Sequence, residues 1–391
     1  MMMNQRFPDI RFTRNPILLS EPLRGDRTLP RAFYVSVGGD VVYTGHCASA
    51  VAVDVAEMAE AHVEPLPDPD GAAVDDCGIL RKMEDSIEFD RRCVTVVDGF
   101  GDLLTEDFYA IPGGISPQNF RRLAQLDSDI FTARLLDRRR NFFLTTRTHG
   151  WRIVMDELEL YPLAFVSLEA EPVKLKLRAV GTDFTSPEID IPRGIYSIDI
   201  AAVRRKMATD YGYLASAFDV VYADRYLSCQ IVIRDTEPET DTTLIRFRNS
   251  LGVFELLHLS GKRKSGVIPP DSEEDARRYD RTTGRYIGMR PRATLATSID
   301  VDSGFRTADE MRFILDMAAS EEVYIHDRTG WVRVVPAVEA LSMPDPQTEP
   351  ETLSVSFRLA DDYDSMTPDI ADLKDFERPR IFSDQHTDEF N

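Results

Sequence analysis

The chain has 391 residues, of which 43% are hydrophobic and 29% are charged. This length is enough for roughly two or three domains with cores of their own, and the ordinary composition excludes a wholly disordered chain. The formal net charge of −21 argues against a free-standing nucleic-acid binder, because a phosphate backbone requires a concentrated positive face.

Neither a membrane span nor a secretion signal is expected. No apolar run approaches the roughly 20 residues that cross a bilayer, and residues 1–10 lack a charged segment followed by an apolar one. The cysteines are irregularly spaced, with no Cys-x-x-Cys pair and no histidine at metal-ligand spacing. We expect all four to be reduced thiols in the core: Cys47, Cys77, Cys93 and Cys229.

Strands and short helices alternate along the chain. Alternating apolar residues at 32–37 and 41–45 flank two glycines and predict a β-hairpin. Apolar residues recur at helical spacing within 308–319, which is the clearest helix. Further helices are predicted at 56–61, 117–126 and 201–209, and further strands at 50–55, 93–97, 141–146, 151–155, 195–200, 218–222, 227–233, 243–247, 253–260, 323–325, 331–335 and 352–359.

Two pairs of similar segments indicate an internal duplication. The segments around the two tryptophans, Trp151 and Trp331, lie 180 positions apart, and the same offset places Lys174–Ala179 on Ser354–Leu359. A solenoid with a short fixed period is excluded, because other landmarks need unequal loops. We therefore predict a mainly β fold with short helices, in β-sandwich-like domains that form two diverged tandem copies.

The duplication suggests a domain order. We expect an N-terminal β domain at 1–105, a β/α domain at 106–180 that completes the first copy, a β domain at 181–240, a β/α domain at 241–362 that completes the second copy, and an acidic C-terminal arm at 363–391. Four residues serve as matching landmarks of the two cores: Trp151, Trp331, Arg178 and Arg358. The tryptophans are interpreted as core anchors, with exposed sugar-stacking aromatic residues as the alternative.

Two regions are predicted to contact other subunits. Residues 263–290 are charged and almost devoid of aliphatic side chains, which is typical of an exposed loop between strands. The C-terminal arm carries isolated aromatic residues that cannot build a core, so it either frays or docks on a neighbour. The candidate interface residues are Arg263, Lys264, Arg277, Arg278, Phe376, Phe382 and Phe390. Solvated charge is the alternative for the basic groups.

No catalytic constellation is recognisable in the sequence. The glycine pairs lack the lysine and helix of a phosphate-binding loop, and the acidic turns at 68–76 and 300–304 lack the distal glutamate of a calcium loop. The six histidines are scattered, and no serine has a nucleophile-elbow context. We therefore expect a protein that is not an enzyme and that binds no cofactor and no metal.

Three phrases carry a resemblance to a known group of proteins. They are Tyr109–Ile115, Asn141–Thr148 and Phe247–Glu255, and they resemble segments of uncharacterised proteins of Bacteroidetes phages and prophages. The resemblance implies a β-rich protein encoded among virion or tail-assembly genes. It transfers no catalytic residue.

The leading hypothesis is a non-enzymatic structural component of a phage tail or baseplate. Its partners would be other tail proteins and copies of itself in an oligomer or ring, and it would be made in the bacterial cytoplasm and reside in the virion. A carbohydrate-binding or adhesive β-sandwich module is the first alternative, and a hydrolase of host envelope polymers is the second.

Overall fold

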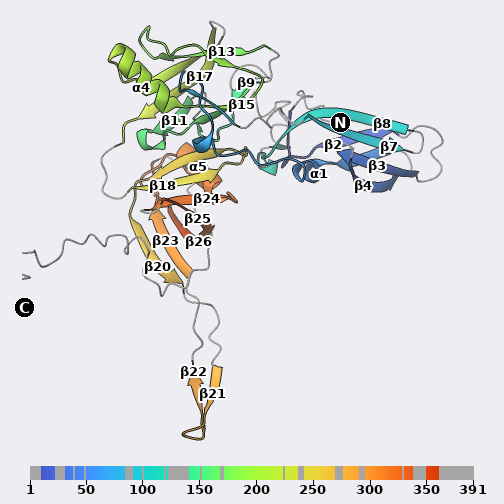
Figure 1. The fold of residues 1–391 in the computed structure, drawn as a ribbon, viewed down its shortest axis with the longest axis vertical. Helices are drawn as coiled ribbons and strands as arrows, with labels where there is room; N and C mark the ends of the chain where they lie inside the picture. Colours follow the sequence, from blue (N-terminus) through green and yellow to red (C-terminus); the bar gives the residue numbers. More distant parts are fainter. Residues whose placement is uncertain are drawn as a thin grey trace, which may run out of the picture. The chain divides into compact units, whose positions relative to one another are not determined.

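The computed structural model describes sixteen stretches of the chain: residues 10–22, 31–37, 40–47, 50–83, 91–98, 101–118, 120–121, 141–149, 152–167, 171–222, 225–236, 242–268, 276–289, 296–327, 330–337 and 349–360. Within them the protein is mainly β, with several sheets and few short helices (Figure 1), as the sequence predicts. No helix of these stretches is long and apolar enough to cross a membrane.

The chain divides into two compact units. Unit 1 comprises Met1–Pro238, Phe247–Leu257 and Ala308–Ser320, and unit 2 comprises Glu239–Arg246, His258–Thr307 and Glu321–Asn391. Two later segments of the chain, Phe247–Leu257 and Ala308–Ser320, thus fold with the N-terminal part. The predicted domain boundaries at 105, 180, 240 and 362 stay a prediction.

Unit 1 begins with a five-stranded sheet of order β1-β8-β7-β3-β4, in which only β1 and β8 are parallel. Its strands are β1 (Ile10–Phe12), β8 (Gly101–Ile111), β7 (Arg91–Asp98), β3 (Arg31–Val37) and β4 (Asp40–Cys47). A second pair, β2 (Leu18–Pro22) and β5 (Ala50–Asp54), precedes helix α1 (Ala56–Glu60). Leu19, Val35, Ala59 and Phe108 belong to one buried apolar cluster. The five-stranded sheet is therefore packed against the β2–β5 pair and α1.

The largest core of unit 1 lies between a six-stranded and a four-stranded sheet. The six-stranded sheet has the order β10 (Thr148–His149), β11 (Arg152–Asp156), β17 (Arg225–Arg234), β16 (Ala217–Tyr222), β13 (Val173–Ala179) and β14 (Ile189–Ile191). The four-stranded sheet has the order β6 (Leu80–Lys82), β15 (Gly194–Ile198), β12 (Leu163–Ser167) and β9 (Asn141–Phe143). Phe165, Leu177 and Phe218 belong to one buried cluster with residues of both sheets, which makes this part sandwich-like.

Helix α4 (Ile200–Tyr211) closes this core. The Asp199 carboxylate caps it by accepting from the Ala202 amide at 2.8 Å, and Gly212 ends it at φ 64°. Short 3-10 helices lie at Pro69–Gly71 and Glu157–Glu159.

A seven-stranded sheet has the order β19-β18-β24-β25-β26-β23-β20. Its strands are β19 (Phe254–Leu259), β18 (Thr243–Arg248), β24 (Val323–Asp327), β25 (Gly330–Ala337), β26 (Ser354–Leu359), β23 (Ala296–Asp302) and β20 (Arg263–Ile268). The adjacency of β18 and β19 confirms the predicted strand pair at 243–247 and 253–260. Helix α5 (Ala308–Ala318) buries Met311, Ile314 and Met317, as its apolar spacing predicts.

The predicted loop 263–290 contains regular structure. Its first residues form β20 at one edge of the seven-stranded sheet, and its last form an antiparallel hairpin of β21 (Ala276–Asp280) and β22 (Arg285–Met289). The hairpin is a two-stranded sheet of its own. We call residues 276–289 the basic hairpin.

The sheet topology does not show the predicted duplication. Strands β25 and β26 are antiparallel neighbours, whereas the strands aligned with them, β11 and β13, are separated by β17 and β16. In addition, β11 is parallel to β17. Similar phrases therefore occupy different positions in their sheets, because short strand sequences do not specify which strands pair.

Three of the four landmark residues, Trp331, Arg178 and Arg358, lie in described strands. Val332 and Val334 pair with the buried Ile325 and Val323, so Trp331 projects from the opposite face of β25 and is partly exposed. Arg358 is exposed and Arg178 is half-buried. Trp151 lies outside the described residues.

The cysteines are partly as predicted. Cys47, Cys77 and Cys229 form no disulfide with any described residue, and Cys229 is buried in the large core of unit 1, where burial raises its pKa to about 12. Cys77 is exposed, in contrast to the predicted core position, because it lies in the turn before β6.

Candidate interaction site

The three phrases that carry the phage resemblance meet in unit 1. Asn249 lies at their junction: its side-chain oxygen accepts from the amides of Leu251 at 3.0 Å and Val253 at 3.2 Å. Its amide nitrogen donates to the Leu144 carbonyl at 3.3 Å and to Glu255 Oε1 at 3.1 Å. A buried asparagine with all its hydrogen-bonding groups engaged fixes the geometry of the segments around it.

Two glycines let the first and third phrases approach backbone to backbone. Gly113 has φ 128° and Gly252 has φ 89°, and the Gly114 amide donates to the Ser250 carbonyl at 2.6 Å. A Cβ atom on Gly252 would lie 1.8 Å from the Pro112 carbonyl oxygen, and one on Gly113 would lie 2.6 Å from Ser250. Only glycine fits both positions.

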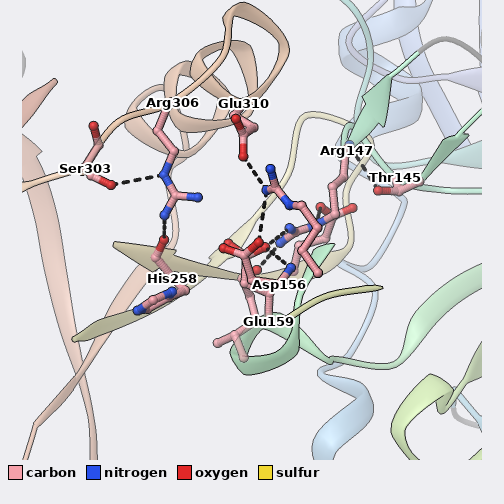
Figure 2. Close-up of polar contacts among 11 residues, drawn as sticks. Thr145, Arg147, Asp156, Glu159, His258, Ser303, Arg306 and Glu310 are labelled. Carbon is pink, nitrogen blue, oxygen red and sulfur yellow. Dashed lines mark hydrogen bonds and ion pairs between the residues drawn. The ribbon is translucent and has the colours of Figure 1, made fainter. Parts of the chain in front are cut away.

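A buried ion cluster, of which Figure 2 labels Arg147 and Glu159, adjoins this junction through the bond from Asn249 to Glu255. Arg147 is 8% exposed and hydrogen-bonds to Glu159 and to the Leu256 carbonyl, and its Nε lies 3.7 Å from Glu255 Oε2. The Arg147 guanidinium also lies 4.1 Å from the centre of the Phe313 ring on α5. We call Arg147, Glu159 and Glu255 the buried ion cluster.

Glu255 is the most perturbed member of the buried ion cluster. It is 4% exposed, and no atom of the described residues hydrogen-bonds to its Oε2. Burial raises the pKa of its carboxyl to about 7, although the Arg147 charge and the hydrogen bonds from Thr145 and Asn249 act in the opposite direction. A perturbed carboxyl can mark a catalytic acid or base. Here its neighbours are an arginine and an asparagine that both hold structure, which favours a packing role.

Further hydrogen bonds tie α5 and the short helix at 157–159 to the same junction. Asp316 accepts from Thr146 Oγ1 at 2.7 Å and from the Ser250 amide at 3.2 Å. Arg234 lies 3.0 Å from Asp156 and also hydrogen-bonds to Glu310. These polar groups form hydrogen bonds and ion pairs with one another, and these interactions hold the loops in place.

Unit 2 has its own buried arginine. Arg306 donates to the Ser303 carbonyl at 3.0 Å and to the His258 carbonyl (Figure 2), and its backbone pairs with Glu351. Ser303 Oγ accepts from the Leu353 amide at 2.8 Å. The arginine therefore closes the turn between β23 and α5 and has a structural role.

Trp331 belongs to an aromatic and cationic group on the outer face of unit 2. The Arg246 guanidinium lies 4.7 Å from the centre of the Trp331 ring and 5.1 Å from that of Tyr324. His326 meets Trp331 edge to face at 5.0 Å. The group is partly open to solvent, so it can offer aromatic faces to a ligand.

The basic hairpin is the most exposed secondary structure in the described chain. Residues 277–279 and 281–288 are all exposed, including Tyr279 at 51%, Tyr286 at 71% and Ile287 at 48%. Tyr279 and Tyr286 lie opposite each other on the two strands, with ring centres 5.2 Å apart. Large apolar and aromatic groups gathered on an exposed element mark an interaction surface.

The turn of the hairpin is internally well formed. Asp280 accepts from the Thr282 amide at 2.9 Å and from Thr283 Oγ1 at 2.7 Å, which lowers the pKa of its carboxyl. Gly284 takes φ 64°, and its amide donates to the Asp280 carbonyl at 2.9 Å. The only carboxylate of the hairpin is thus engaged in the turn.

The arginines of the hairpin remain available. Arg277, Arg278, Arg281 and Arg285 are exposed, and among the described residues none of them has an ion-pair partner. Arg278, Tyr279, Asp280, Arg281, Thr282 and Ile287 line an open hollow. The surface combines arginine with tyrosine, the residues enriched at the energetic centres of protein interfaces.

The predicted interface residues fall into three groups. Arg277 and Arg278 lie together on β21 of the basic hairpin, whereas Arg263 and Lys264 lie on the edge strand β20. Phe376, Phe382 and Phe390 are outside the described residues. Tyr279, Arg281, Arg285 and Tyr286 are not among the predicted interface residues, although arginine and tyrosine recur at 278–279 and 285–286 on either side of a Gly-containing turn.

No group of three or more histidine, cysteine, aspartate or glutamate side chains in the described stretches could hold a metal ion. The described residues therefore offer no candidate metal centre.

No family model matches the chain, and no curated protein sequence matches it. One solved chain that aligns with it belongs to a structure described as "Virion of native gene transfer agent (GTA) particle". That chain is 14% identical, with 30% of this chain and 91% of the solved one covered, at a TM-score of 0.21. A likeness at this TM-score assigns neither a shared fold nor a role.

Proposed function

We propose that this protein is a non-enzymatic structural component of a phage virion, in the tail or baseplate, that joins neighbouring subunits. The basic hairpin carries the proposal, because it exposes two tyrosines, Ile287 and four arginines outside any larger sheet. An exposed hairpin that is rich in tyrosine and arginine has the composition of a surface that binds other proteins.

The rest of the described molecule supports the same role. The buried ion cluster and the junction at Asn249 use their polar groups to hold segments together, and the three phrases that resemble phage proteins form that junction. Satisfied buried polar networks make a fold rigid, and a rigid fold suits a subunit that holds its neighbours in place. The partners would be other tail proteins and further copies of this chain.

The proposal is tested by mass spectrometry of purified virions from a phage that encodes this chain. We expect the chain at a fixed number of copies per particle and in cross-links to neighbouring tail proteins. Its absence from particles, with presence in the infected cell only, would refute a virion role.

The outer face of β24 and β25 favours a second candidate function, a carbohydrate-binding or adhesive module. Trp331 and Tyr324 present partly open aromatic rings beside His326, and such rings stack on sugars. Binding on a glycan array that is lost in Trp331→Ala would establish this function. Because Arg246 already covers the Trp331 ring, the structural role remains the stronger proposal.

A further inference from the structure

We propose that the basic hairpin docks on the acidic surface of a second copy of this chain. The inference rests on the proposed assembly function and names the partner of its interaction site. It concerns residues 276–289 and the charge of the chain that carries them.

Charge complementarity points to a second copy. Four arginines against one aspartate give the hairpin a net charge of +3, which leaves −24 on the remaining residues of a chain whose total is −21. Every copy therefore carries this basic hairpin on a chain whose remaining residues are strongly acidic in sum. Such a distribution attracts the hairpin of one copy to the body of another and orients the encounter.

The chemistry of the exposed residues provides the binding energy that charge alone lacks. Arg277, Tyr279 and Tyr286 lie on one face of the hairpin, because residues alternate between faces and Tyr279 pairs with Tyr286. Burial of tyrosine rings beside arginines is the usual centre of a stable protein interface. Surface arginines can reach carboxylates with two parallel hydrogen bonds.

The architecture of the hairpin also favours a partner. A two-stranded hairpin has little stability alone in water, and nearly all residues of this one are exposed. Docking through the face that carries Arg277, Tyr279 and Tyr286 would cover the tyrosine pair and would stabilise the strands. A heterologous contact of this kind, hairpin to body, extends from copy to copy and closes into a ring where the rotation allows it.

Nucleic acid is the competing ligand for an arginine and tyrosine hairpin. The acidic remainder of the chain would repel a phosphate backbone, while it attracts a basic hairpin. The observations therefore favour a second copy, and nucleic-acid binding becomes an outcome of the test.

The test is sedimentation velocity of the full chain across a concentration series at low and high salt. We expect reversible self-association at 50 mM NaCl that weakens at 500 mM, and at least about a tenfold weaker association for R277E/R278E. Arg205→Glu with Lys206→Glu on α4 makes the same change in net charge at residues outside the hairpin and should retain association. Y279S/Y286S should weaken association while the charge is unchanged.

Circular dichroism of each variant shows that loss of association is not loss of folding. The proposal is overturned if the wild-type chain stays monomeric, if R277E/R278E and the α4 control behave alike, or if the hairpin variants lose binding to a labelled DNA duplex with self-association intact. A monomeric chain that is still found in virions would refute docking between copies and leave the proposed virion function standing.

Discussion

The buried ion cluster and the basic hairpin use arginine in opposite ways. Arg147 is 8% exposed and donates hydrogen bonds to Glu159 and to a backbone carbonyl, whereas the four hairpin arginines are exposed to solvent. A buried arginine must be paired, because an unpaired buried charge is costly, while an exposed one contributes little to folding. The contrast teaches that the chain separates residues that hold its scaffold from residues available to partners.

The largest expected effect is at the glycine junction. Gly252→Ala places a methyl group 1.8 Å from the Pro112 carbonyl oxygen at a residue with φ 89°, so we expect a loss of at least about 3 kcal/mol or failure to fold. Gly71→Ala is the control, because nothing lies within 4 Å of its added Cβ. Urea unfolding monitored by tryptophan fluorescence measures both. Equal stability of the two variants would show that the close approach is not required.

Removal of Arg147 should have the next largest effect. Arg147→Met keeps much of the side-chain volume but leaves Glu159 and Glu255 buried without their cation, so we expect the free energy of unfolding to fall by about 3–5 kcal/mol. The exposed Arg277→Met is the matched control, with a change below about 0.5 kcal/mol. A small loss in both variants would place Arg147 among the dispensable surface charges.

The pH dependence of stability should depend on Glu255. Its pKa is raised from 4.5 to about 7 in the folded chain, so its contribution to stability is fully present below pH 4.5 and is lost as pH rises through 7. Glu255→Gln stays uncharged, so its stability relative to wild type should improve by up to about 3 kcal/mol between pH 4.5 and pH 8. A pH-independent difference between the two proteins would mean that Glu255 does not titrate in this range.

Much of the fold follows from local patterns, and the junction does not. The apolar spacing of α5 and the alternation in β3 and β4 are properties of neighbouring residues, so they could be predicted. Asn249 meets Leu144 across 105 positions of the chain, and no local pattern encodes such a pairing. The same limit explains why similar phrases around the tryptophans suggested a duplication that the sheet topology does not show.

The position of Trp331 could have been read from its strand. Along β25, Val332 and the buried Val334 lie on one face of the strand, and Trp331 and Arg333 lie on the other. The tryptophan therefore shares its face with a charged residue. The predicted core position instead relied on the size of the side chain. Likewise, the turn at Asp280–Gly284 already indicated a hairpin within the charged segment.

The smallest effect on folding is expected at the hairpin tyrosines. Y279S/Y286S removes two rings that are 51% and 71% exposed, so the free energy of unfolding should change by less than about 0.5 kcal/mol. Differential scanning calorimetry at micromolar concentration, where association is weak, measures this difference. A large loss would mean that the rings are part of the core of unit 2.

The central claim, that the hairpin contacts neighbours and the buried junction holds the scaffold, is tested most directly by competition during virion assembly. Cells that make equal amounts of two tagged chains, one intact and one with residues 276–289 replaced by a glycine and serine linker, would supply the particles. We predict that purified virions contain the intact chain and exclude the other, although both fold. Equal incorporation of the two chains would contradict the account.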